Sequence, residues 1–250
     1  MLAIGEFWAK TSGTWMNIAT VAVGTGLGLL VRQRLSMSMQ KIITQGIGLT
    51  TLPIGLTMAD DLTKVEVGPI NGVVLGLLAM VVGGILGEWW EIEERLAAMG
   101  NWLKVRFRGQ GKFAEGFVAA SLIFCVGPLA LIGSLKNGLE GDDTLLTVKA
   151  TLDGITSVAL TSSYGIGVGF SILTILLYQG GVSLVAGVFA DTLVDPNNNP
   201  YVLMVTGVGG LSILAIGINL LDLGKIRVAS FLPSLLLAPI FLALSARWFS

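Results

Sequence analysis

The sequence predicts an all-α fold, a polytopic transmembrane helical bundle with about eight spans. Two observations carry this prediction. The chain of 250 residues is 53% apolar and only 12% charged, whereas a soluble domain is about 25% charged. So few charges could not cover a soluble surface, so the remaining surface must face lipid. The 34 glycines lie largely within the apolar runs, where small residues let membrane helices approach closely.

Eight apolar runs have a length suited to crossing a bilayer, which takes about 20 residues. They are 15–31, 42–58, 68–87, 113–135, 144–163, 167–190, 201–221 and 229–246. The stretch 144–190 is too long for one span, and we predict two spans that turn near Tyr164 and Gly165. The alternative is one span and a re-entrant segment, which would give seven crossings. We expect one membrane domain over residues 1–250.

Basic residues set the expected orientation, because cytoplasmic loops of membrane proteins are rich in Lys and Arg. Ten of the fifteen fall in loops that share one side of the eight-span arrangement: Arg32, Arg34, Lys41, Arg95, Lys104, Arg106, Arg108, Lys112, Lys225 and Arg227. The opposite loops are acidic. We therefore predict that the basic loops are cytoplasmic and that both termini lie outside.

The third loop carries its own helical pattern. Over residues 88–108, apolar side chains recur at steps of three and four: Trp89, Ile92, Leu96, Met99, Leu103 and Phe107. This spacing is typical of one helix face. We predict an amphipathic helix on the cytoplasmic interface. It would serve as an anchor, or alternatively as a gate or a docking site for a soluble partner.

Two segments resemble each other at a separation of 162 residues. Residues 48–56 (GLTTLPIGL) align with residues 210–218 (GLSILAIGI), and the same offset brings Asp60 onto Asp222. The second and seventh spans run in opposite directions, so the copies would form an inverted repeat, as in many secondary transporters. The alternative is a chance match between two Gly-rich helices.

Polar groups inside the apolar runs are the candidate functional residues, because a charge at mid-bilayer costs about 2.5–3.5 kcal/mol on insertion scales. Asp153 lies about ten residues into the fifth run, with Ser157 one turn later. Lys149 lies one turn earlier on the same face. The carboxylate would bind a cation or proton, with Ser157 as a neutral ligand. Alternatively, Lys149 neutralises Asp153 and the pair serves folding only.

Three further residues complete the predicted ion or substrate site. Gln179 precedes Gly180 and Gly181 in the sixth run, a pattern that favours a broken helix with a polar lining. Asn219 ends the seventh run, and Glu115 opens the fourth. We interpret Gln179 and Asn219 as neutral ligands and Glu115 as a second titrating or gating group.

Several classes of function are excluded or disfavoured. The chain has no histidine and a single cysteine, Cys125, which removes the commonest general base, metal ligand and disulfide. We predict no enzyme, no cofactor and no metal. A net charge of −1 gives no case for nucleic acid.

Ordered sequence blocks add a family resemblance. They include Glu115-Gly116-Phe117, Phe124-Cys125-Val126-Gly127-Pro128, Leu152-Asp153-Gly154, Leu177-Tyr178-Gln179-Gly180 and Ile216-Gly217-Ile218-Asn219. With these blocks the chain resembles the bacterial YqgA/YdfK-type membrane proteins, the domain-of-unknown-function family 554. One departure is Ser230, where the family pattern has Asn. The resemblance implies a multipass protein of the bacterial inner membrane and implies no activity.

Together, these features favour a small secondary transporter or channel-like carrier of an ion or small solute. The chain would sit in the lipid bilayer as a homo-oligomer. The rival hypothesis is a structural or partner-binding membrane protein that does not transport. Convergence of Asp153, Gln179 and Asn219 on a water-accessible cavity near mid-membrane would favour transport. An Asp153 sealed against Lys149 in a close-packed bundle without a cavity would instead exclude the transport hypothesis.

Overall fold

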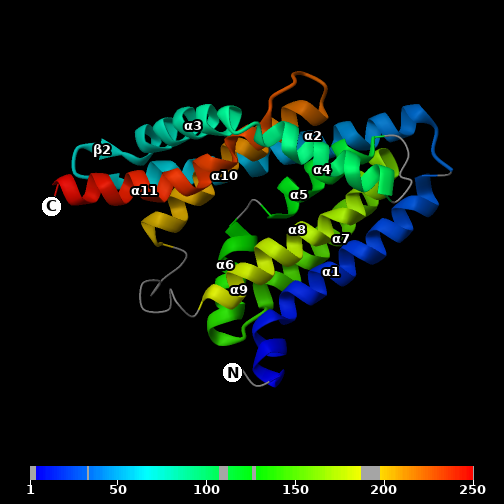
Figure 1. Ribbon diagram of the computed structural model, residues 1–250, viewed down its shortest axis with the longest axis horizontal. Coiled ribbons are helices and arrows are strands. Elements are labelled where there is room, and N and C mark those ends of the chain that lie inside the picture. Colours follow the sequence, from blue (N-terminus) through cyan, green and yellow to red (C-terminus); the bar gives the residue numbers. More distant parts are fainter. Residues whose placement is uncertain (1–3, 33, 107–111, 126–127, 187–197, 250) are drawn as a thin grey trace. The chain divides into compact units, whose positions relative to one another are not determined.

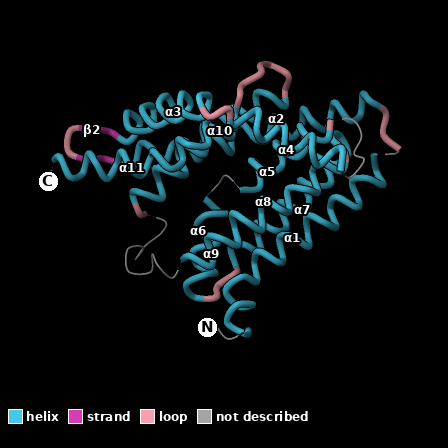
Figure 2. Tube along the Cα trace, in the orientation of Figure 1, coloured by secondary structure: helices cyan, strands magenta, loops and turns pink. Residues whose placement is uncertain are grey.

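The computed structural model describes residues 4–32, 34–106, 112–125, 128–186 and 198–249. These residues are almost entirely helical (Figures 1 and 2). Within them the only strands are β1 (Glu66–Val67) and β2 (Ile70–Asn71), which form a short antiparallel hairpin. The predicted all-α polytopic fold is confirmed.

Six helical segments of the described residues are long and apolar enough to cross a membrane. Helices α5 (Phe113–Cys125) and α6 (Pro128–Glu140), bent by 59°, would add a seventh span if they cross as one. The predicted span 113–135 is therefore not one straight helix. Helix α7 (Thr144–Tyr164) covers the fifth predicted span and has 21 residues, but it is not among the six. Its Lys149, Asp153, threonines and serines lower its mean hydropathy below that of the six.

The chain divides into two compact units, each assembled from two separate stretches. Unit 1 comprises Met1–Ile47 and Ala98–Val194, and unit 2 comprises Gly48–Ala97 and Asp195–Ser250. The sequence predicts one membrane domain and contains no composition change at these boundaries. The division instead follows which helices pack against which, and it runs through helices α2 and α4.

Unit 1 is built around a close parallel pair, α1 (Ile4–Arg32) and α7 (Figure 1). Glycines on α1 make the contact possible. A Cβ on Gly13 would lie 2.5 Å from Leu146 Cδ1, and one on Gly28 would lie 2.7 Å from the Val158 carbonyl oxygen. Between them, Gly24 sits directly against Ser157. The contact therefore runs along most of both helices.

An apolar cluster in the core of unit 1 includes the only cysteine. Val21, Phe124, Leu160 and Ile175 form a buried cluster with Cys125. This core links α1 and α7 to α5 and to the segment that follows Gly165.

The sixth predicted span is a chain of short helical pieces. It contains a 3-10 turn at Ile166–Phe170, α8 (Ser171–Ile175), a π-helical turn at Leu176–Gly180 and α9 (Gly181–Val185). Gly165, at φ +86°, makes the turn from α7, which confirms the turn predicted there. The interruption predicted at Gln179 takes the form of the π-helical turn. The last predicted residues of this span, 187–190, lie outside the described residues.

In unit 2, α2 (Met37–Ala59) packs its C-terminal half antiparallel against α10 (Pro200–Leu220). Four glycines line the contact in reciprocal fashion. A Cβ on Gly48 would lie 3.2 Å from the Gly217 oxygen, and one on Gly217 would lie 3.3 Å from the Gly48 oxygen. The corresponding distances between Gly55 and Gly210 are 2.9 and 2.7 Å.

A second antiparallel pair in unit 2 joins α3 (Gly72–Trp89) and α11 (Leu232–Phe249). Gly83 lies against Ser234 and Gly87 against Ser230. The β-hairpin and the 3-10 turn Asp60–Lys64 precede α3, so the predicted start of this span at residue 68 is four residues early. The Asn71 side chain caps α3 by accepting a hydrogen bond from the Val73 N–H at 2.8 Å.

The predicted amphipathic helix corresponds to α4 (Ile92–Arg106). It begins four residues later than predicted, because α3 continues to Trp89 and Glu91 turns the chain at φ +53°. Gly100 and Leu103 are its buried residues, whereas Trp89 is 73% exposed. Phe107 and Arg108 of the prediction lie outside the described residues.

Candidate functional site

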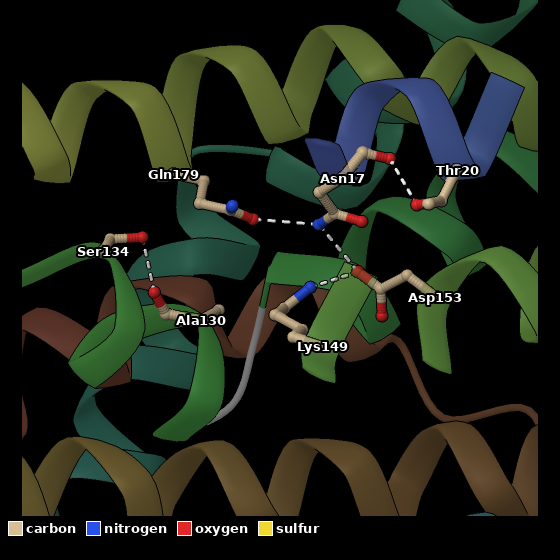
Figure 3. Close-up of polar contacts among 7 residues, drawn as sticks. All are labelled: Asn17, Thr20, Ala130, Ser134, Lys149, Asp153 and Gln179. Atoms are coloured by element: carbon tan, nitrogen blue, oxygen red, sulfur yellow. Dashed lines mark hydrogen bonds and ion pairs between the residues drawn. The ribbon is translucent and has the colours of Figure 1, made fainter. Parts of the chain in front are cut away.

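Four polar side chains form a connected network inside unit 1. Lys149 and Asp153 make an ion pair one helical turn apart on α7. The Asn17 side-chain Nδ2 donates to the same carboxylate oxygen, Asp153 Oδ2, at 2.9 Å. It also donates to Gln179 Oε1 at 2.9 Å. Asn17 thus lies between the ion pair and Gln179 (Figure 3).

The local structure explains how these residues meet. Gly13 and Gly24 bracket Asn17 on α1, and both glycines touch α7, so the short Asn17 side chain reaches Asp153. On the other side, Gln179 lies in the π-helical turn. A π-helical turn is rare and often found at functional sites.

All four side chains are shielded from solvent. Asn17 and Gln179 are 0% and 1% exposed, and Lys149 and Asp153 are 6% and 7% exposed. Removing two charges from water costs several kcal/mol per ion. The attraction between the two ions offsets this cost only when good hydrogen bonds satisfy their remaining donors and acceptors. The Asn17 donor supplies one such bond. The network is therefore a costly arrangement that depends on each member.

Seven buried side-chain polar atoms have no hydrogen-bond partner in the described structure, and two of them belong to the network. They are Thr14 Oγ1, Asn17 Oδ1, Thr25 Oγ1, Thr161 Oγ1, Ser171 Oγ, Gln179 Nε2 and Ser183 Oγ. All seven belong to unit 1. Buried polar atoms are nearly always partnered in native proteins, and exceptions call for an explanation. Their concentration here marks this interior as a candidate binding site.

The structure brings together three of the five predicted site residues. Asp153 and Gln179 meet through Asn17, and Ser157 lies one turn beyond Asp153. The Ser157 hydroxyl donates within α7 to the Gly154 carbonyl oxygen at 2.8 Å, which leaves its oxygen able to accept.

The other two predicted residues have different surroundings. The Glu115 side chain is 62% exposed and pairs with Lys112 at 3.6 Å. Asn219, in unit 2, closes the turn after α10: its Nδ2 donates to the Ile226 oxygen at 2.7 Å, and its Oδ1 accepts from the Ile226 N–H at 2.8 Å. Both ends of that amide are therefore used in holding a loop.

Sequence reasoning missed Asn17 and Thr14. The predicted first span starts at residue 15, which places Asn17 near a membrane boundary, whereas α1 starts at Ile4 and has Asn17 near its middle. A signal was present, because Thr14, Asn17, Gly24 and Gly28 follow one helical face at steps of three, four or seven.

The fold and this interior define a polytopic α-helical membrane protein with a buried charged network. Comparison with known proteins then identifies its family. Residues 12–243 match the family model described as "Protein of unknown function (DUF554)", so the chain belongs to that family, which confirms the resemblance drawn from its sequence blocks.

Two curated relatives cover nearly the whole chain. The "Uncharacterized membrane protein YdfK" of Bacillus subtilis (strain 168) is 30% identical over 228 residues, 91% of this chain and 94% of that protein. The "Uncharacterized protein YqgA" of Escherichia coli (strain K12) is 28% identical over 243 residues, 94% of this chain and 97% of that protein. No solved structure gives a significant match.

Proposed function

We propose that the chain is a small secondary transporter or channel-like carrier of an ion or small solute. The observation that carries the proposal is the buried network in which Asn17 connects the Lys149–Asp153 pair to Gln179. Intramembrane ionisable residues that face a bundle interior usually mark ion or substrate paths. The unpartnered hydroxyls and amides around the network supply further ligands.

The helix positions agree with the inverted repeat predicted from the sequence, which would support this proposal. Adding 162 to the bounds of α1 and α2 gives 166–194 and 199–221, close to the segment Ile166–Val185 and to α10. The same shift takes α3 to 234–251, near α11. Within unit 2, the α2–α10 and α3–α11 pairs are antiparallel. Three helices would then be repeated, with α4 to α7 inserted between the copies.

The reciprocal glycine contacts agree with such a repeat. A shift of 162 residues takes Gly48 to Gly210 and Gly55 to Gly217. The same shift therefore maps the Gly48–Gly217 contact onto the Gly55–Gly210 contact. A local two-fold axis that relates the two copies requires this exchange. Inverted repeats of this kind place substrate sites at the interface of the copies.

The proposal includes a location and an assembly. The basic loops favour the bacterial cytoplasmic membrane with those loops inside. The small size of the helical domain favours a homo-oligomer. We propose no enzymatic role, since the chain lacks histidine and its described residues hold no cluster of three or more metal-ligating side chains.

One observation favours the rival function, a structural or partner-binding membrane protein. Lys149 already neutralises Asp153 within a close-packed helix pair, as a pair that serves only folding would do. The two functions differ in how they depend on the positions of the two charges.

Flux measurements in proteoliposomes test the proposal. The purified chain would be assayed with a panel of monovalent cations and small metabolites. Asp153→Asn should abolish any flux that the chain supports, while Asp142→Asn in the exposed loop before α7 should leave it unchanged. Flux that survives Asp153→Asn would reject the role of this carboxylate, and no flux for any solute would reject the carrier.

A charge exchange separates the two candidate functions. The double variant Lys149→Asp with Asp153→Lys keeps a neutral pair on one helix face but moves the carboxylate by one turn, away from Asn17. A pair that serves only folding should tolerate the exchange, with near-normal thermal stability. A carrier should fold and lose flux.

A further inference from the structure

Four of the unpartnered atoms belong to Thr14, Asn17, Gln179 and Ser183, and we call these four residues the patch. Thr14 lies one turn before Asn17 on α1, and Ser183 lies one turn after Gln179. The two segments run antiparallel, because Asn17 contacts Gln179 and a Cβ on Gly180 would lie 3.6 Å from Thr14 Cγ2. Thr14 and Ser183 therefore lie at the same level, next to the Asn17–Gln179 contact.

This patch is fully buried and built from neutral oxygen and nitrogen atoms. Thr14, Gln179 and Ser183 are each 1% exposed, and Asn17 is 0% exposed. The Asn17 amide has a fixed orientation, because only its NH₂ group can donate to the Asp153 carboxylate. Its Oδ1 is consequently a pure acceptor without a partner. A buried acceptor without a partner calls for a donor or a cation.

We infer that Asp153, Asn17 and Thr14 form a binding site for a monovalent alkali cation, which competes with the Lys149 ammonium for the carboxylate. This inference rests on the proposed function and names its substrate or coupling ion. The ligands are one carboxylate oxygen, one amide oxygen and one hydroxyl oxygen, with Ser183 as a fourth oxygen at the same level. The carboxylate disfavours an anion.

The donor set also selects against divalent ions. Ca²⁺ and Mg²⁺ sites in proteins use several carboxylates or retain water, whereas this interior holds one carboxylate that a lysine already neutralises. Among the described residues, no group of three or more acidic, histidine or cysteine side chains could hold a metal ion. The π-helical turn at Leu176–Gly180 adds irregular backbone beside the patch, and irregular backbone carbonyls coordinate Na⁺ in discontinuous transporter helices.

Competition with Lys149 gives the site a functional consequence. Without the cation, the ammonium occupies Asp153 Oδ2 and the network carries no net charge. With the cation bound, Lys149 loses its partner and the network gains one positive charge. Cation binding is thereby linked to the position of Lys149, which is a direct route from an ion to a helix rearrangement.

Thermal unfolding of the purified full-length chain in detergent tests the site. A ligand that binds only the native state raises the melting temperature with its concentration. At constant ionic strength, replacing choline chloride by NaCl, KCl or LiCl should raise the melting temperature of the wild-type chain in a saturable manner, with one cation most effective. Equal melting temperatures in choline and in all three alkali salts would overturn the inference.

Variants locate the effect. Thr14→Val should weaken the apparent cation affinity about tenfold, since it removes one hydrogen-bonding group that serves a charge. Thr20→Val removes a hydroxyl that only bonds the Asn17 backbone oxygen at 3.0 Å, and should leave the affinity unchanged. Lys149→Gln should raise it, because the competing ammonium is gone. An alkali effect insensitive to Thr14→Val and Lys149→Gln would place the cation elsewhere and overturn the site.

Two outcomes separate this inference from the proposed function. A melting temperature that responds to pH but not to alkali salts would replace the cation by a proton and overturn the inference, while flux of another solute would leave the carrier standing. Saturable alkali binding that depends on Thr14 and Lys149, without flux in proteoliposomes, would support the site and reject the carrier.

Discussion

The side-chain amide of Asn17 donates a hydrogen bond to the side-chain oxygen of Gln179, 162 residues further along the chain, at a distance of 2.9 Å. The same separation relates Gly48 to Gly210 and Gly55 to Gly217. If the chain contains an inverted repeat, Asn17 and Gln179 are equivalent positions that meet near a local two-fold axis. Asp153 lies on the inserted helix α7 and accepts a hydrogen bond from Asn17, on one side of this contact.

Replacing Asn17 tests how far the network depends on its central residue. Asn17→Ala removes the donor to Asp153 and the donor to Gln179, and leaves both acceptors buried. A hydrogen bond to a charged group contributes about 1.5–3 kcal/mol, so we expect the variant to lose roughly that much stability. Thermal unfolding in detergent would measure the loss.

Thr20→Val is the matched control for this substitution, because its hydroxyl bonds only within α1. A full-stability Asn17→Ala chain would mean that Asp153 and Gln179 find other partners. In that case the network could not be the fixed site described above.

Two glycines of α1 predict opposite effects of the same substitution. A Cβ on Gly28 would lie 2.7 Å from the backbone oxygen of Val158, so Gly28→Ala must push α1 away from α7. Gly26 has nothing within 4 Å of the same position, and Gly26→Ala should be neutral or stabilise the helix by about 0.5–1 kcal/mol. Melting temperatures of the two variants should therefore move in different directions. Equal responses would show that α1 and α7 do not pack as closely as described.

Reciprocal glycines in unit 2 allow a test of the contact between α2 and α10. Gly55→Ala and Gly217→Ala change equivalent positions, where the added Cβ would lie 2.9 Å from the Gly210 oxygen and 3.3 Å from the Gly48 oxygen. Both variants should destabilise the chain, the first more strongly because its contact with a backbone oxygen is closer. Gly46→Ala, with open space around it, is the control. A harmless Gly55→Ala would argue against a close α2–α10 pair.

The sequence was sufficient to predict the helices but not the site. Five of the eight predicted runs match single helices to within five residues at each end, because lipid-facing segments must satisfy their backbone internally. They are 42–58, 68–87, 144–163, 201–221 and 229–246. Hydropathy could not show that α1 starts eleven residues before its apolar run, because polar side chains in this first part have partners only in the folded chain. The Ser12 hydroxyl donates to Asp143 at 2.7 Å, for example.

Asp153, Gln179 and Asn219 show where reasoning from single positions ends. Each is a polar residue in or at the end of an apolar run, and the cost of burial marks all three equally. Only the fold shows that Asp153 and Gln179 share a partner, whereas the Asn219 amide is used by the Ile226 backbone. The sequence did not reveal the role of Asn17, because that role depends on contacts with residues 136 and 162 positions away in the chain.

An exposed ion-pair cluster joins the start of α4 to the loop before α11 in unit 2. Arg227 pairs with Glu88 and Glu94, and Glu93 accepts from the Ala229 N–H at 2.8 Å. Exposed pairs are worth about 0–1 kcal/mol each, so Arg227→Ala should change the melting temperature little. It should instead raise amide hydrogen exchange in the first turn of α4, most clearly at low salt. Lys225→Ala is the control, and unchanged exchange in the Arg227 variant would show that Glu93 alone holds the helix.

Asp142, just before α7, has a carboxylate whose protonation should change the melting temperature. Asp142 accepts a hydrogen bond from the Thr144 N–H at 3.0 Å, and hydrogen bonds from Thr144 lower the pKa of Asp142 below its ordinary value. A lowered folded-state pKa means that the ionised form stabilises the fold. Its contribution is complete above the unfolded-state pKa of about 3.9 and is lost as pH falls through the lower folded-state value.

The melting-temperature difference between wild type and Asp142→Ala should therefore be constant at neutral pH and shrink in acid. Asp142→Asn keeps a hydrogen-bond acceptor but loses the charge. Over that acid range, the melting temperature of this variant should therefore lack the change that titration of Asp142 causes. If the melting-temperature difference between wild type and Asp142→Ala instead grew as the pH fell, the effect would have the opposite sign and would contradict this assignment.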